Sequence, residues 1–473
     1  MICNLYLLVF GGQMSGKNLQ SVLAHIDADL KSSTGRLFDF LKIPSISTDP
    51  LYKEDCIMAA DWLVRDLNQI GFDTSRRDTK GHPMVVGHAG SAGKHLLFYG
   101  HYDVQPIDPI EMWNKKPFEP YLAKGDLGDV ICARGAADDK GQLMTFIEAC
   151  RSWKTVHGRL PGKISVFFEG EEESSSPSLI PFMKKNAQEL KADIALICDT
   201  GLFGDYTPGI VTSLRGVLKE ELTITGPSKD LHSGMYGGAS TNPARVLSKV
   251  LASLHDGKGY IKIPNFYDGV EEVSSKIKSQ WEELNFDVKS FLGQVGLSQL
   301  AGEHGRTALE MIWARPTCEI NGIWGGYTSD GFKTVLPSEA SAKVSFRLVG
   351  KQNPILIQKN FRSFVRAMLP VDCSAQFRSH GQSTGTEMSI DNPVFEAARL
   401  ALSDEWPNKA AFIGCGGSIP IAGYFKSILG MDALLIGFGR ENDAIHSPNE
   451  KYDLRSFHKG IRSWARILDK IYN

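Results

Sequence analysis

The sequence contains no hydrophobic run long enough to span a bilayer. Its apolar first segment, CNLYLLVFGG, is shorter than the roughly 20 residues that a membrane helix needs, and it lacks the basic flank and the cleavage site of a signal peptide. There is no excess of positive charge either, because 52 lysines and arginines stand beside 54 aspartates and glutamates, for a formal net charge of −2. We therefore expect no nucleic acid and no membrane among the partners.

Cysteine pairs of the CxxC type are also absent. The eight cysteines are spread along the chain, mostly within apolar runs, which predicts buried free thiols and a reducing, cytoplasmic environment. A Walker phosphate loop and a strand-linked GxGxxG motif are missing as well, so no nucleotide site is indicated. What is present is the composition of a globular protein, with 42% hydrophobic and 22% charged residues.

The hydrophobic pattern changes twice along the 473 residues, which are too many for one ordinary core. Up to about residue 211, buried runs such as HLLFYGH and ISVFFEG alternate with amphipathic helices, as in a parallel sheet covered on both faces. Segments such as VLKEELTITG and SAKVSFRLVG then alternate apolar and polar residues, which is typical of half-buried antiparallel strands. After about residue 386 the first pattern returns, and it ends in the helix LRSFHKGIRSWARILDKIY.

These changes predict an α/β protein in which one domain interrupts another. Residues 1–211 and 387–473 form a three-layer domain around a mostly parallel central sheet, and residues 212–386 form an inserted α+β domain. Near the start of the chain, helical periodicity predicts helices over residues 18–73, preceded by a poorly ordered extension before Met14.

Several of the apolar runs end in side chains that can bind a metal ion. HLLFYGHYDV ends in His101 and Asp103, DIALICDT in Asp199, and ALLIGFGRENDAIH in His446, while Asp138 lies where the turn RGAADDKG enters a helix. In α/β sheets, ligands collect at the carboxyl ends of the strands, so that residues far apart in sequence can converge there. Two histidines and several carboxylates in such places predict a two-metal hydrolytic site.

Each of these residues also has an ordinary structural alternative. Asp138 and Asp199 could cap helices, and His446 could lie in a surface loop. GEEESSS places three glutamates together, which is costly unless cations or solvent compensate their repulsion. In the functional interpretation, one glutamate binds metal and its neighbour takes a proton from water. The repetition at successive strand ends favours the metal site over five separate coincidences.

Taken together, the motifs resemble one known family. GHYDVQP, RGAADDKGQ, EGEEESSS, ICDTG, KDLHSGMYGG, SFRLV, GCGGSIP and HSPNEKYDL occur in the order found in the carnosinase and Cys-Gly dipeptidase branch of the co-catalytic zinc metallopeptidases, which are relatives of aminoacylase and glutamate carboxypeptidase. The resemblance implies a dipeptidase that hydrolyses the amide bond of dipeptides with two divalent metal ions. Zinc is the first expectation, with manganese or cobalt as alternatives, because imidazole and carboxylate ligands do not choose among them.

The resemblance also implies a role for each matching residue. Asp138 bridges the two ions, His101 and Asp199 complete the ligands of one, and Glu173 and His446 complete those of the other. The peptide bond between Asp138 and Asp139 is expected to be cis, as it often is in the family.

Glu172 is the expected general base, which removes a proton from the water that bridges the ions, and Asp103 orients His101. Glu171 raises a question of register. Glu172 and Glu173 match the family because Ser174 follows them, and a structure with Glu171 or Glu172 as the ligand would reject that match.

The inserted domain is implied to be a lid and dimerisation domain. In the resembling homodimers it lends a histidine to the active site of the partner, and His232 in KDLHSGMYGG matches that histidine and could stabilise an oxyanion. Arg347, Thr334 and Ser418 match residues that hold the C-terminal carboxylate of a dipeptide, for which a guanidinium is well suited.

Two points leave the substrate open. The stretch HGQSTGTEMSIDNP has no tryptophan where many members of the branch carry one, which weakens the transfer of a particular substrate such as carnosine or Cys-Gly. An N-acyl amino acid deacylase or desuccinylase would use the same metals and the same base, and it is the alternative function. A non-catalytic binding protein is disfavoured because all five ligands and the base are present.

Overall fold

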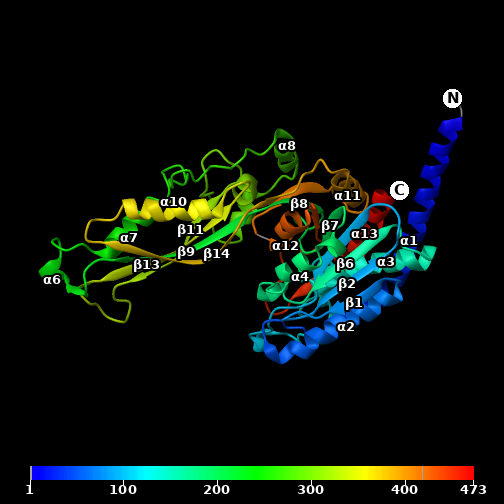
Figure 1. The fold of residues 1–473 in the computed structure, drawn as a ribbon, viewed down its shortest axis with the longest axis horizontal. Coiled ribbons are helices and arrows are strands. Elements are labelled where there is room, and N and C mark those ends of the chain that lie inside the picture. Colours follow the sequence, from blue (N-terminus) through cyan, green and yellow to red (C-terminus); the bar gives the residue numbers. More distant parts are fainter. Residues whose placement is uncertain (1–2, 418) are drawn as a thin grey trace. The chain divides into compact units, whose positions relative to one another are not determined.

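A computed structural model of the chain describes residues 3–417 and 419–473, with side chains from Asn18 onward (Figure 1). The chain divides into two compact units. The first contains Met1–Val211, Met388–Phe412 and Tyr424–Asn473, and the second contains Thr212–Glu387 and Ile413–Gly423. Residues 413–423, which the sequence assigns to the first domain, group with the second unit because Arg215 donates hydrogen bonds to the carbonyl oxygens of Gly416 and Gly417.

The first unit is built on a sheet whose centre is parallel. Its strands follow the order β1 (Asp73–Arg77), β2 (Met84–Ala89), β6 (Lys163–Glu169), β3 (His95–His101), β7 (Ile194–Ile197), β17 (Ala433–Ile436) and β8 (Gly209–Leu214). Two further short strands, β15 (Thr386–Glu387) and β16 (Ala411–Cys415), also pair with β8. β3 runs parallel to β6 and β7, and β7 runs parallel to β17, whereas β1, β2 and β8 pair antiparallel at the flanks. The predicted α/β class with a mostly parallel central sheet is confirmed.

Helices cover both faces of this sheet. Successive side chains of β3 point to opposite faces and are buried, so both faces need a covering layer. Phe98 stacks on Phe146 with ring centroids 3.9 Å apart and meets the edge of Trp464. Tyr99 points to the other face, where its ring lies 5.8 Å from that of Phe425. The first face therefore carries α3 (Lys140–His157) and α13 (Leu454–Tyr472), and the second carries η5 (Phe425–Leu429). The other helices of this unit are α1 (Cys3–Leu41), α2 (Lys53–Gln69), α4 (Leu179–Lys185), α5 (Ala187–Leu190) and α11 (Pro393–Ser403), with short turns η1 (Pro50–Tyr52), η2 (Ile110–Met112) and η3 (Glu172–Ser174).

The beginning of the chain differs from the expectation. α1 begins at Cys3 rather than after Met14, since no proline interrupts the segment up to Leu41. Residues 1 and 2 of the expected extension lie outside the described residues. The predicted helical region 18–73 is broken between α1 and α2, where prolines fall in the connection. No helix among the described residues is both long enough and apolar enough to cross a bilayer. The seven cysteines whose side chains are described form no disulfide, and five of them are buried.

A small three-stranded sheet joins two distant parts of the first unit. β5 (Gly128–Cys132) lies between β4 (Tyr121–Gly125) and β18 (Lys451–Asp453). In its register, Lys451 is opposite Cys132. The chain just before β18 is thereby placed beside the chain just after β5.

The second unit is an α+β structure. Its antiparallel sheet follows the order β11 (Thr317–Gly325), β13 (Glu339–Leu348), β9 (Gly216–Thr225) and β14 (Ser374–Ser383). α7 (Pro243–Ala252) and α10 (Pro354–Ala367) share one core with β9 and β13, in which Val250, Phe361, Leu222 and Phe346 are buried. The remaining elements are short: β10 (Leu231–His232), β12 (Val335–Leu336), β15 (Thr386–Glu387), β16 (Ala411–Cys415), α6 (Ser233–Tyr236), α8 (Ser275–Glu283), α9 (Val288–Gly293), the π-helix η4 (Glu310–Ala314) and α12 (Pro420–Tyr424).

Candidate metal centre

Three neighbouring parallel strands deliver the candidate ligands at their carboxyl ends. β3 ends at His101, β7 is followed two residues later by Asp199, and β6 leads into η3, which begins with Glu172 and Glu173. Because β6, β3 and β7 are adjacent and point the same way, their ends meet at one edge of the sheet. Asp138 joins them from the turn before α3 through a cis peptide bond to Asp139.

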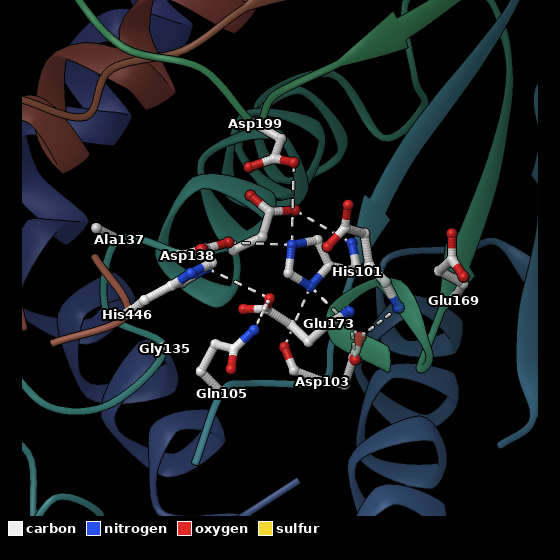
Figure 2. A network of polar contacts seen from close by, with 12 residues as sticks. His101, Asp103, Gln105, Gly135, Ala137, Asp138, Glu169, Glu173, Asp199 and His446 are labelled. Carbon is white, nitrogen blue, oxygen red and sulfur yellow. Dashed lines mark hydrogen bonds and ion pairs between the residues drawn. The ribbon is translucent and has the colours of Figure 1, made fainter. Parts of the chain in front are cut away.

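The structure brings the five predicted ligands into two groups that share Asp138 (Figure 2). In each group, one ligand atom per residue lies within 4.8 Å of the others; the groups are His101, Asp138, Asp199 and Asp138, Glu173, His446. Oδ1 of Asp138 lies 3.1 Å from Nε2 of His101, and Oδ2 of Asp138 lies 2.9 Å from Nε2 of His446. The two oxygens of one carboxylate therefore face different histidines.

Several carboxylates lie close together in these groups, and their negative charges raise the pKa values of their neighbours. Burial and the charge of Asp138 raise the pKa of Asp199 well above its usual range. Burial alone would lower the pKa of His101, but hydrogen bonds to Asp103 and Asp138 outweigh it and the pKa is raised. Asp138 and Glu173 raise the pKa of His446 to about 10. The carboxylates that raise the pKa of these two imidazoles carry a negative charge that a bound divalent cation would also offset.

The donor set fits divalent cations. Each group combines a histidine nitrogen with carboxylate oxygens, a combination that suits zinc and manganese. Oε1 of Glu173 is buried and has no hydrogen-bond partner among the described atoms, so its lone pairs are available to bind a cation.

Asp103 connects His101 to the glutamate turn. Nδ1 of His101 lies 3.1 Å from the carbonyl oxygen of Asp103 and 3.4 Å from its Oδ1. The same carboxylate accepts hydrogen bonds from the backbone N–H groups of Glu172, at 3.2 Å, and Glu173, at 3.0 Å. Asp103 is fully buried, so these bonds fix the imidazole and the turn relative to each other.

The three consecutive glutamates have different surroundings. Glu171 turns away from the metal groups and accepts hydrogen bonds from the backbone N–H of His82 and of Ser178. Glu173 lies in the group with His446. Glu172 is half-buried, and burial raises the pKa of its carboxyl, with Glu173 adding to the effect and His101 opposing it. Glu173, and neither Glu171 nor Glu172, belongs to a candidate ligand group, and the register in which Glu173 is the ligand and Glu172 the base stays a prediction.

The sequence did not single out two residues that contact these groups. Nε2 of Gln105 donates a 2.6 Å hydrogen bond to Oε2 of Glu173. Glu450 accepts hydrogen bonds from the turn that carries Asp138. Both lie inside motifs that resemble the family, GHYDVQP and HSPNEKYDL, and only this position in the sequence pointed to a role at the site.

The remaining predicted residues belong to the second unit. His232 and Thr334 lie close together, since β10 pairs with β12 and the N–H of Ser233 donates to the carbonyl of Thr334. Arg347 is half-buried on β13, opposite Thr317 and Val217. Ser418 lies outside the described residues.

Arg215 in the second unit was not predicted. Its guanidinium donates to the carbonyl oxygens of Gly416, Met311 and Arg315, next to the glycine turn of GCGGSIP. Burial and the nearby charge of Arg347 lower the pKa of Arg215 to about 10. Arg215 thus lies beside the glycine turn and close enough to Arg347 to feel its charge, and two guanidinium groups near each other favour an anionic ligand.

Comparison with known proteins places the chain among peptidases. The chain is 31% identical to the Cys-Gly metallodipeptidase DUG1 of Candida albicans over 455 residues, which cover 92% of this chain and 93% of the relative. It is 25% identical to the Beta-Ala-His dipeptidase of Homo sapiens over 493 residues, covering 99% and 96%.

Solved structures agree with the sequence relatives. The di-peptidase Dug1p from Saccharomyces cerevisiae superposes with a TM-score of 0.75 at 29% identity, covering 96% of this chain and 98% of the other. The M20 family metallo-carboxypeptidase Sso-CP2 from Sulfolobus solfataricus gives 0.77 at 30% identity, covering 93% and 99%. A family model described as peptidase family M20/M25/M40 matches residues 97–470. The predicted resemblance is confirmed, and the chain belongs to peptidase family M20/M25/M40.

Proposed function

We propose that this protein is a dipeptidase that works with two divalent cations, one held by His101, Asp138 and Asp199 and the other by Asp138, Glu173 and His446. The observation that carries the proposal is the sharing of Asp138, whose two oxygens face the two histidines. Relatives named as metallodipeptidases favour a dipeptide substrate over an N-acyl amino acid. Zinc is the proposed metal, with manganese as the alternative.

Catalysis is assigned to Glu172. When bound, the cations acidify a water molecule and polarise the amide carbonyl of the substrate. Glu172 would accept a proton from the attacking water and deliver it to the leaving amine. A raised carboxyl pKa suits a group that must both accept and release a proton near neutral pH. Asp103 keeps this base and His101 in a fixed relation through its bonds to both segments.

The second unit is proposed to act as lid and dimerisation domain, with residues 212–386 inserted into the catalytic domain. β11 ends the strand order of its sheet, and among the described residues its only strand neighbour is β13. Exposed apolar side chains lie along this edge strand, namely Ile320, Ile323 and Trp324. Such an edge is prone to pair with another chain, which supports a homodimer.

Substrate recognition is proposed for four residues of this unit. Arg347, Thr334 and Ser418 take the C-terminal carboxylate of the dipeptide, and His232 of the partner subunit stabilises the oxyanion. The cytoplasm is the proposed location, since buried thiols outside disulfides, such as those of Cys56 and Cys150, are typical of reducing compartments.

The test is to strip the protein of metal, restore Zn²⁺ or Mn²⁺ separately, and assay dipeptides with a free amine beside N-acetyl and N-succinyl amino acids. We expect metal-dependent cleavage of the free-amine dipeptides. Preference for the blocked substrates would assign the protein to the deacylases, and metal-independent cleavage would contradict the proposed centre.

A further inference from the structure

Glu450 makes four hydrogen bonds to a single turn. Its Oε2 accepts from Nη1 of Arg134 at 2.9 Å and from the N–H of Gly135 at 2.8 Å. Its Oε1 accepts from the N–H of Ala137 at 2.8 Å and from that of Asp138 at 3.0 Å. The carboxylate is fully buried. It therefore satisfies three backbone N–H groups and one guanidinium N–H of the turn that presents Asp138. Figure 2 shows Asp138 between His101 and His446.

The same residue also terminates the loop that presents His446. The carbonyl oxygen of Glu450 accepts from the N–H of Ala133 at 3.2 Å, and pairing of β18 with β5 begins at the next residue. Within the loop, Ala444, His446 and Asn449 have φ values of 55°, 60° and 64°. Residues other than glycine keep such φ values only where their surroundings hold them.

Asn449 fastens the loop beside Glu450. Its Oδ1 accepts from the N–H of Asn114 at 2.7 Å, and its Nδ2 donates to the carbonyl of Met112 at 2.8 Å. The end of the loop is thus fixed on two sides. His446 itself is largely exposed, and its ring contacts Asp138 and Glu173, so the backbone must supply much of its orientation.

We propose that Glu450 is a positioning residue of the metal centre, which locks the Asp138 turn to the His446 loop and so fixes the distance between two ligands of the same cation. The inference rests on the proposed function, in which both residues bind metal. Glu450 is not itself one of the candidate ligands, because both of its oxygens accept hydrogen bonds from the turn.

Only a carboxylate suits this position. Four donors converge on two oxygens, and each oxygen can accept two bonds. A glutamine would turn an NH₂ group toward two of these donors. Arg134 is also buried, its second terminal nitrogen donates to the carbonyl of Pro106, and Glu450 supplies its charge partner.

The experiment compares Glu450→Gln with Glu441→Gln by calorimetric titration of Zn²⁺ into the metal-free proteins. Glu441 is exposed in the same connection between β17 and β18, so it provides the same chemical change without burial. We expect the wild type and Glu441→Gln to bind two Zn²⁺ ions alike. Glu450→Gln should lose at least about tenfold in affinity for one or both ions, the usual cost of removing a group that orients a ligand. Its circular dichroism should remain that of a folded protein.

A second variant covers the case in which Glu450→Gln does not fold. Arg134→Met combined with Glu450→Gln removes the buried charge that would lose its partner, while the amides of the turn still lack the carboxylate. We expect the same loss of Zn²⁺ affinity. Wild-type affinity for both ions in either folded variant would overturn the inference while leaving the proposed function intact. A wild type that binds fewer than two ions would overturn the proposed function itself, and this inference with it.

Discussion

Three consecutive glutamates show how strongly a single residue's task depends on its position. Glu171 secures the turn by accepting two backbone N–H groups, and Glu173 joins the ligands around Asp138. Glu172 lies between them with a raised carboxyl pKa. In a 3₁₀ turn, successive side chains point about 120° apart, so neighbours in sequence face different surroundings. One short acidic run therefore supplies a structural support in Glu171 and, in the proposed function, a base in Glu172 and a ligand in Glu173.

The first prediction at this scale concerns Glu172→Ala. We expect kcat for a dipeptide to fall by about 10²–10⁴-fold, the usual contribution of a general base. The metal content, measured by mass spectrometry of the purified protein, should stay at the wild-type level because the variant removes no ligand. Glu441→Ala, at an exposed site, serves as the control. Near-normal turnover in Glu172→Ala would reject the assignment.

A second prediction concerns the close approach of Gly437 to the chain around Asp199. A Cβ at Gly437 would lie 1.8 Å from the carbonyl oxygen of Thr200, so the backbone beside Asp199 would have to move. We expect Gly437→Ala to lower the free energy of unfolding by about 1–3 kcal/mol and to weaken Zn²⁺ binding.

The matched control for that change is Gly35→Ala in α1. A Cβ at Gly35 would meet no atom within 4 Å. Alanine is the better helix former, so this variant should gain about 0.5–1 kcal/mol in urea unfolding. An equal response of the two variants would argue against the steric explanation.

The sequence predicted which side chains the structure brings together around Asp138, because their chemistry is visible in the residue types and their places follow from strand ends. The contacts of Gln105 and Glu450 were not predicted, because both residues form hydrogen bonds to other protein groups. Such bonds depend on the path of two loops, and no periodicity in the sequence encodes that path. The role of Arg215 was hidden for the same reason, since its partners are carbonyl oxygens.

At the scale of elements, long periodic segments were predictable and short ones were not. α13 spans the predicted residues Leu454–Tyr472, and α3 and α10 agree within a few residues. Apolar residues recur at helical spacing in all three, although α3 is buried on all sides from Lys140 to Cys150. α8, α9 and η4 were missed. They are short and partly exposed, so too few apolar positions recur to establish a period.

A prediction for elements concerns the contact between α11 and α13. Just after α11, Glu405 accepts hydrogen bonds from Arg462 and Arg466, both at 2.8 Å, on α13. Burial would raise the pKa of Glu405, but these bonds outweigh it and lower the pKa. A lowered carboxyl pKa stabilises the fold above the unfolded value of about 4.3, and this contribution is lost as the pH falls through the folded pKa.

Glu405→Gln should therefore cost about 1.5–3 kcal/mol at pH 7, measured by urea unfolding, and the difference from the wild type should shrink below about pH 4.3. Glu396→Gln in α11 is the matched control, because Glu396 pairs with Arg399 at an exposed site. It should change stability little at either pH. A cost for Glu405→Gln that does not depend on pH would contradict the role of the carboxylate charge.

At the scale of the whole molecule, the proposed homodimer makes a prediction about mixed subunits. If His232 acts across the interface, Glu172→Ala and His232→Ala are each inactive alone. A heterodimer of the two has one site with an intact base and an intact histidine. Random exchange of subunits should then restore about a quarter of the wild-type activity. No recovery, in a mixture whose subunit exchange is demonstrated by mass spectrometry, would place His232 in the site of its own subunit or outside any site.

The division of ligands between two groups has a consequence for the chain as it is made. His101, Asp138 and Asp199 all precede the second unit in the sequence, whereas His446 follows it. Synthesis proceeds from the N-terminus, so the ligands of one cation leave the ribosome before the second unit exists. If these residues bind metal as proposed, the nascent protein carries every ligand of one cation, and Glu173 of the other, before His446 is made.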